Sequence, residues 1–146
     1  MIPSRLLASV LILAAPPALA ADFKSVGPAP VILYDTPTTK GVKLYIAPRA
    51  MPLQVVLSYG DWVKVRDMHG ELAWTEAKGL TARRNVIVST PGARVFAAPD
   101  ERAPVLMTAD KGVVLELVDP TALTWVRVRH RDGITGFVRP ADVWGL

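Results

Sequence analysis

Asp61-Trp-Val-Lys-Val-Arg66 and Thr124-Trp-Val-Arg-Val-Arg129 are nearly the same segment written twice in this sequence. In both copies valines alternate with larger or charged residues. This is the two-residue period of a β-strand that buries one face and exposes the other. We therefore predict a strand in each segment, with the valines facing a core and the lysine and arginine side chains facing solvent.

The duplication extends outward from these segments to most of the chain. With an offset of 63, five of the twenty positions from Asp61 to Leu80 are identical in the second copy. Upstream the offset falls to 62, and there Tyr34 aligns with Phe96 and Leu53 with Leu115. The one-residue difference falls in a predicted loop, where an insertion is tolerated. The sequence thus predicts two structural repeats.

Short apolar runs bounded by turn residues fill both repeats. The runs are Val31 to Tyr34, Leu53 to Leu57, Asn85 to Ser89 and Val113 to Val118. Asp132-Gly133, between two alternating stretches, is a typical hairpin turn, and thirteen prolines and ten glycines punctuate the chain. Only Thr75 to Leu80 and Pro140 to Trp144 could hold a helical turn. We predict an all-β chain of two small barrels, each with five or six strands, that pack together because no long polar linker separates them.

The first twenty residues have the order of features of a secretory signal peptide. Arg5 precedes an apolar run, Leu6 to Ala15, which is followed by Pro16-Pro17 and Ala18-Leu-Ala20. The apolar run is shorter than the roughly 20 residues that span a bilayer. No cysteine is present to accept a lipid anchor or form a disulfide. We expect a periplasmic protein that is cleaved after Ala20, with a signal peptide at 1–20, a first repeat at 21–82 and a second at 83–146.

The charge balance excludes one class of partner and suits another. Without Arg5, 16 basic residues face 13 acidic ones, and both signs are dispersed along the chain. Nucleic-acid-binding proteins instead have a dense basic stripe, so we exclude nucleic acid as a partner. A mildly cationic surface suits anionic partners, including the carboxylate-rich peptides of the cell wall.

Catalytic and metal-binding patterns are missing from the sequence. It contains no cysteine nucleophile, no Gly-x-Ser-x-Gly, no phosphate-binding glycine loop and no spaced His or Cys cluster. His69 and His130 lie in equivalent hairpin turns, each two residues from an aspartate, Asp67 or Asp132. We interpret these four as exposed turn residues rather than as metal ligands or general bases. We predict no enzyme activity, no metal and no cofactor.

Each repeat resembles the bacterial SH3-like domain. The resemblance is carried by Tyr34-Asp-Thr-Pro37 or Phe96-Ala-Ala-Pro99, the Trp-Val-basic-Val-Arg strand, a glycine turn, and Ala73-Trp74 or Gly136-Phe137. It covers essentially all of the chain after residue 20, and the whole chain is similar to small exported proteins of Gram-negative bacteria. The resemblance implies two SH3-like barrels, binding at the cell envelope and no catalytic machinery. Because Ala97 and Ala98 replace Asp35 and Thr36, the two repeats need not share a ligand groove.

Aromatic residues are the first group of candidate binding residues. SH3-type grooves hold extended or polyproline-like peptides against aromatic rings. The candidates are Tyr34, Tyr59, Trp62 and Trp74, of which the two tyrosines, next to turns, should be accessible. The alternative is that Trp62 and Trp74, like other large rings in small barrels, fill the core or cap its ends.

Arginines are the second group of candidate binding residues. Arg127, Arg129 and Arg131 alternate along one predicted strand, and Arg66 corresponds to Arg129 in the first repeat. Such a row could bind carboxylates, or it could simply be a solvated strand face. We predict a non-catalytic periplasmic module that recognises a cell-wall stem peptide or a protein segment. The alternative is a structural adaptor of a periplasmic protein complex.

Overall fold

The computed structural model describes residues 21–120 and 124–146. The predicted signal peptide, residues 1–20, and its cleavage after Ala20 lie outside the described residues. Among the residues described, no helix is both long enough and apolar enough to cross a membrane.

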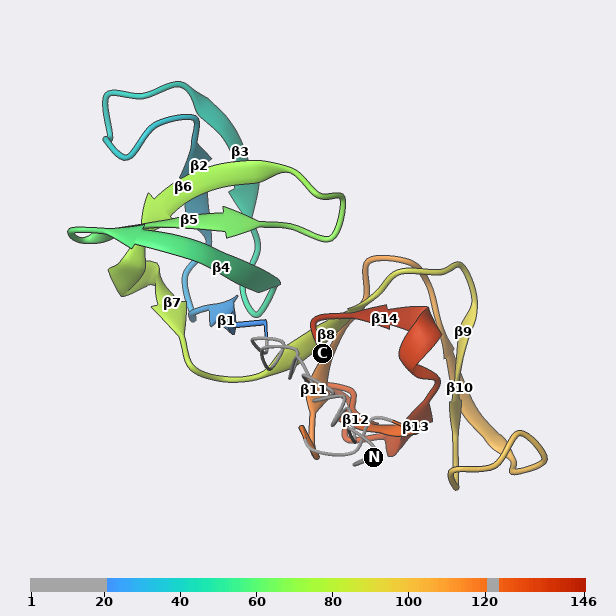
Figure 1. Cartoon of the computed structure of the whole chain (residues 1–146). Coiled ribbons are helices and arrows are strands. Elements are labelled where there is room, and N and C mark those ends of the chain that lie inside the picture. The colour runs from blue at the N-terminus through green and yellow to red at the C-terminus, as the bar shows by residue number, and fades with distance from the viewer. Residues whose placement is uncertain (1–20, 121–123) are drawn as a thin grey trace, which may run out of the picture.

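In the described residues, the first repeat forms seven strands and one short 3-10 helix (Figure 1). They are β1 (Phe23–Val26), β2 (Val31–Tyr34), β3 (Lys43–Ala47), β4 (Pro52–Tyr59), β5 (Trp62–Arg66), β6 (Leu72–Glu76), η1 (Ala77–Gly79) and β7 (Leu80–Thr81). The strands follow the spatial order β3-β2-β6-β5-β4-β1-β7, and all neighbours are antiparallel.

The described part of the second repeat forms the same elements in the same arrangement. They are β8 (Asn85–Val88), β9 (Ala93–Phe96), β10 (Val105–Ala109), β11 (Val114–Leu117), β12 (Val126–Arg129), β13 (Thr135–Val138), η2 (Pro140–Asp142) and β14 (Val143–Trp144). Their order is β10-β9-β13-β12-β11-β8-β14, which matches the first sheet strand for strand.

The all-β fold and the duplication are therefore confirmed, and the predicted number of strands is corrected. Each repeat has seven strands among the described residues instead of five or six. The additional ones include β7 and β14, which are two residues long and so too short to show an alternating pattern. The short helices η1 and η2 lie within the two segments for which a helical turn was predicted.

Alternation buries the valines of the duplicated segment as predicted. Val65 in β5 and Val128 in β12 are each 1% exposed, whereas Arg127 and Arg129 are exposed. Two separate clusters of buried residues result, one in each repeat. Leu33, Leu53 and Val65 are among the residues of the first cluster, and Val86, Val95 and Leu115 are among those of the second. Each repeat thus has its own core.

The two repeats also contact one another, as the lack of a linker predicted. Phe23 of β1 packs edge-on against Trp144 of β14, with ring centroids 5.1 Å apart. The guanidinium of Arg84 lies 5.5 Å from the Phe23 ring centroid. The side-chain amide of Asn85 donates a 2.9 Å hydrogen bond to the carbonyl of Ala50. We call this contact region, formed by these five residues, the junction; β1 lies on the side of the first repeat that faces the second (Figure 1).

Candidate ligand-binding groove of the first repeat

Four aromatic residues of the first repeat form two ring pairs. Tyr34 packs edge-on against Trp62, with centroids 5.5 Å apart, and Tyr59 packs edge-on against Trp74 at 6.5 Å. Tyr59 is 67% exposed, which confirms the prediction for this residue. The prediction that Tyr34 is accessible is wrong, because Tyr34 is packed against Trp62 and is only 7% exposed.

The two tryptophans face away from the core. On β5 and β6 their sequence neighbours Val63, Ala73 and Thr75 are buried, while Trp62 and Trp74 themselves are half-buried. These rings therefore do not fill the core, which was one part of the alternative. In the second repeat, Trp125 and Phe137 are likewise half-buried. The outer face of β4, β5 and β6 thus offers ring surface to a ligand.

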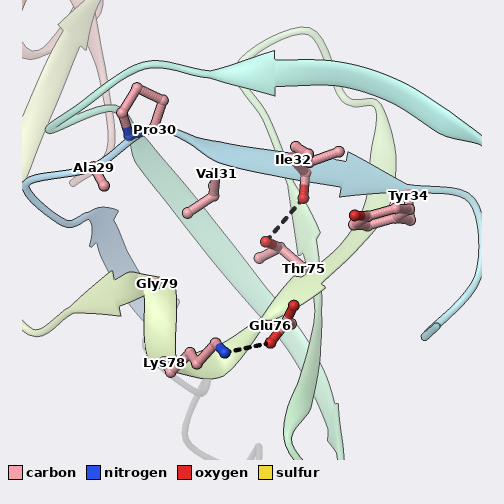
Figure 2. Close-up of a pocket in the computed structure, with 9 residues that line it drawn as sticks. All are labelled: Ala29, Pro30, Val31, Ile32, Tyr34, Thr75, Glu76, Lys78 and Gly79. Carbon is pink, nitrogen blue, oxygen red and sulfur yellow. Dashed lines mark hydrogen bonds and ion pairs between the residues drawn. The ribbon is translucent and has the colours of Figure 1, made fainter. Parts of the chain in front are cut away.

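A groove of about 420 Å³ opens between β2 and the segment from β6 to η1 (Figure 2). It is lined by Ala29, Pro30, Val31, Ile32, Tyr34, Thr75, Glu76, Lys78 and Gly79. The Thr75 hydroxyl donates a 3.1 Å hydrogen bond to the carbonyl of Ile32, which ties β6 to β2 beneath the groove. At Gly79 a Cβ atom would lie 2.5 Å from Cγ1 of Val31, so only glycine lets η1 approach this closely.

Two opposite charges stand on the η1 side of the groove. The Lys78 ammonium lies 3.1 Å from a carboxylate oxygen of Glu76, and the two side chains are 83% and 36% exposed. Ion pairs this exposed typically contribute less than about 1 kcal/mol, so a charged ligand can replace either partner easily. Glu76 also lies directly opposite Trp62 in the β5–β6 register. Glu76 therefore connects the edge of the groove with the strand that carries Trp62.

The predicted arginines do not lie in this groove. Arg66 is on β5, and its guanidinium donates a 3.3 Å hydrogen bond to the side-chain oxygen of Gln54. Arg127 and Arg129 project from β12 of the second repeat, and Arg131 is exposed in the turn beyond it. Of the eight residues predicted to bind ligand, only Tyr34 lines the groove.

The hairpin aspartate of the first repeat has a structural role. Asp67 is 4% exposed, so the prediction that it is an exposed turn residue is wrong. Its carboxylate accepts hydrogen bonds from the Tyr45 hydroxyl at 2.8 Å and from the backbone N–H groups of His69 and Glu71 at 2.9 and 3.0 Å. Burial, and then the adjacent Asp67 carboxylate, raise the pKa of the Tyr45 phenol above its usual value. His69 itself is exposed, as predicted, but the prediction is wrong for His130, whose side chain is only 14% exposed.

Metal-binding side chains do not gather anywhere in residues 21–120 and 124–146. No group of three or more His, Cys, Asp or Glu side chains in these ranges could hold a metal ion.

Sequence reasoning missed the charged side of the groove, Glu76 and Lys78. Both lie in a segment for which only a helical turn was predicted. The signal that could have identified them is a reversal of charge between the repeats. In the alignment that places Trp74 on Phe137, Glu76 falls on Arg139.

Both repeats match one known family. Residues 27–81 and 89–145 each match the family model described as "Bacterial SH3 domain". No curated protein matches the chain.

Several solved structures are similar to the chain. They include NlpC2 and NlpC1 from Trichomonas vaginalis and an NlpC/P60 family protein from Bacillus cereus ATCC 10987. Their sequence identities are 12%, 14% and 18%, and their TM-scores are 0.39, 0.40 and 0.36. The matches cover 86%, 92% and 84% of this chain but 48%, 49% and 55% of the other chains. The chain thus spans about half the length of these structures.

Proposed function

Because the chain belongs to the bacterial SH3 domain family, we propose that it is a non-catalytic binding protein of the cell envelope. In this proposal the first repeat holds an extended peptide segment in its groove. The observation that carries the proposal is the groove itself. Pro30, Val31 and Ile32 give it an apolar side, Glu76 and Lys78 give it a charged side, and Tyr34 closes one end (Figure 2).

The aromatic face beside the groove supports the same proposal. This face presents three aromatic rings, those of Trp62, Trp74 and Tyr59. Aromatic side chains have few rotatable bonds, so they lose little conformational entropy when they contact a peptide. Lys64 lies 5.9 Å from the Trp74 ring centroid, so a positive charge accompanies the rings. A peptide that leaves the groove past Glu76 would meet Trp62 first. Both apolar and acidic side chains of a bound peptide would therefore suit this surface.

The proposed location and ligand class come from the sequence. The order of features in residues 1–20 supports export to the periplasm, with repeats at 21–82 and 83–146 as the mature protein. In that compartment the candidate ligands are the stem peptides of the cell wall and segments of envelope proteins. The absence of nucleophile and phosphate-binding patterns in the sequence supports a role in binding only.

Co-sedimentation with purified wall sacculi tests the proposal. The informative variant is Ile32→Arg, which puts into the groove the residue that the second repeat has at the equivalent position, Arg94. We expect the natural protein to be retained on sacculi and Ile32→Arg to lose most of that retention. Val42→Arg is the matched control, because Val42 is 63% exposed and lies outside both the groove and the strands of the aromatic face. Equal retention of Ile32→Arg and the natural protein would contradict binding at the groove.

One observation favours the alternative of a protein-docking adaptor. In the described residues, seven of the nine large apolar side chains that are exposed lie in the first repeat. Leu44 and Ile46, 48% and 66% exposed, project from the edge strand β3. No retention on sacculi, together with a periplasmic partner protein whose co-purification is lost in Ile46→Glu, would support the adaptor over the peptide-binding module.

A further inference from the structure

The second repeat has two arginines at the positions that form the groove in the first. Arg94 is the second residue of β9, as Ile32 is of β2. Arg139 immediately precedes η2, as Glu76 precedes η1. The second repeat thus has an arginine at one position where the first repeat has an apolar residue, and another arginine where the first repeat has a glutamate.

The two arginines face each other across neighbouring strands. Phe96 of β9 is the register partner of Phe137 of β13. Because the strands are antiparallel, continuing this register by two residues brings Arg94 opposite Arg139. Like charges placed directly opposite in a sheet are destabilising.

Both guanidinium groups lie over the same ring. The central carbons of Arg94 and Arg139 are 5.5 and 5.9 Å from the centroid of Phe96. Phe96 is 2% exposed and also packs edge-on against Trp125, at 5.5 Å. The arginines therefore cover the ring. A guanidinium that stacks on a ring keeps its N–H groups available at its edge.

The charge at this position is only partly balanced. Arg139 pairs with Glu101, with a guanidinium nitrogen 2.8 Å from a carboxylate oxygen. Arg94 is exposed and takes part in none of the ion pairs between described residues. The Nε atom of Arg139 is buried and has no hydrogen-bond partner among those residues. Two positive charges with one negative partner leave room for a second anion.

We propose that the second repeat binds an anionic group, a carboxylate or a phosphate, through Arg94 and Arg139 beside Phe96. Arginine suits both groups because its planar fork donates two parallel hydrogen bonds to two oxygens. In the free protein the Glu101 carboxylate already pairs with the Arg139 guanidinium, so it competes with the ligand for that group. This anion site lies in the other repeat from the peptide groove and uses none of its residues.

The test measures how anions stabilise the full chain. The probes are N-acetylalanine, which carries one carboxylate, and inorganic phosphate, each compared with chloride at equal ionic strength. A ligand that binds the folded state raises the melting temperature in a saturable way, whereas general screening does not discriminate among anions in this manner. We expect at least one of the two probes to stabilise the protein saturably beyond chloride.

Two variants with opposite expected effects make the test specific. Arg94→Gln should weaken binding about tenfold, the effect of losing one charge-assisted hydrogen bond. Glu101→Gln should tighten it about threefold or more, because the competing carboxylate is removed. Lys111→Gln, at an exposed lysine of the same repeat, is the matched control and should bind as the natural protein does.

The outcomes of this test show whether the second repeat binds an anion at these arginines and which kind of anion it binds. Saturable binding of N-acetylalanine alone supports a peptide carboxylate, and saturable binding of phosphate alone supports a phosphate-bearing envelope polymer or lipid. Equal affinity in Arg94→Gln and the natural protein overturns the proposal, as does weaker binding in Glu101→Gln. A response to both probes no greater than the response to chloride overturns it as well. The Ile32→Arg sedimentation experiment is independent of all these results.

Discussion

At the scale of single residues, Tyr45 and Asp67 join β3 to the β5–β6 hairpin through one partly buried hydrogen bond of 2.8 Å. Tyr45→Phe removes the hydroxyl and leaves a buried carboxylate oxygen without that donor. We expect the free energy of unfolding to fall by about 1–2 kcal/mol. Denaturant unfolding at pH 7 measures the loss. Tyr59→Phe is the control, since Tyr59 is 67% exposed and should be insensitive. A Tyr45→Phe variant as stable as the natural protein would show that the bond contributes nothing.

The same residue predicts how stability depends on pH. The pKa of Tyr45 is raised in the folded protein, so folding favours the protonated phenol. Its contribution is complete below the unfolded value of about 10 and is lost as pH rises through the folded value. The stability of the natural protein should therefore decline above about pH 10, and Tyr45→Phe should decline less. Parallel decline of the two proteins would contradict this account.

Gly79 is the residue whose size controls the groove. A methyl group there would overlap Cγ1 of Val31, which lines the opposite side. Gly79→Ala should therefore destabilise the protein by about 1–3 kcal/mol and reduce its retention on sacculi. In the double variant Gly79→Ala/Val31→Ala the clash is removed, so stability should partly recover relative to the sum of the two single changes. A Gly79→Ala variant with unchanged stability would show that η1 moves freely.

At the scale of elements, two kinds of sequence pattern predicted strands. The continuous apolar run Val31 to Tyr34 coincides with β2, and the alternating segment Trp62 to Arg66 coincides with β5. The edge strand β3 was not predicted, and its exposed residues Leu44 and Ile46 are as apolar as buried ones. Hydrophobic alternation alone does not reveal such a strand.

The groove lay beyond sequence reasoning for a different reason. It forms where β2 meets β6, and these strands are distant in the chain although Tyr34 pairs with Trp74. Tyr34 was identified as a candidate because its side chain is aromatic, but no local sequence pattern indicated that Val31 and Gly79 would come into contact. Non-local pairing determines such contacts, and a single sequence does not display it.

The β12–β13 hairpin depends on its glycine. Gly133 has φ of +91°, which L-residues with a side chain rarely adopt, and a Cβ there would meet nothing within 4 Å. Gly133→Ala should therefore lower the free energy of unfolding by about 1–2 kcal/mol through the backbone alone. Gly133→Asn should cost less, because asparagine tolerates this conformation better. Chemical denaturation of the three proteins measures the order, and equal stability of Gly133→Ala and the natural protein would contradict it.

At the scale of the whole molecule, the junction couples two cores that are otherwise separate. We expect the natural protein to unfold in one cooperative transition. Trp144→Ala removes the ring contact with Phe23, which is of a kind worth about 0.5–1.5 kcal/mol beyond area burial. We expect calorimetry of this variant to show two transitions.

Trp125→Ala is the control for the junction. Trp125 packs against Phe96 within the second repeat, so its loss should lower stability without separating the repeats. A single transition in Trp144→Ala, at the melting temperature of the natural protein, would show that the junction does not couple the cores. The lack of a linker predicted that the repeats would touch, but not that Phe23 and Trp144, near opposite ends of the sequence, would make the contact.

The meeting of β1 and β14 at the junction also determines how the molecule would respond to traction. A force applied at the two ends of the described chain would reach these two short strands before it reached either core. β14 pairs with β8 over two positions only, so it would peel away first and release Trp144 from Phe23. The chain would then lengthen at its C-terminal end and Val143 would leave the second core, while the first repeat kept all of its strands.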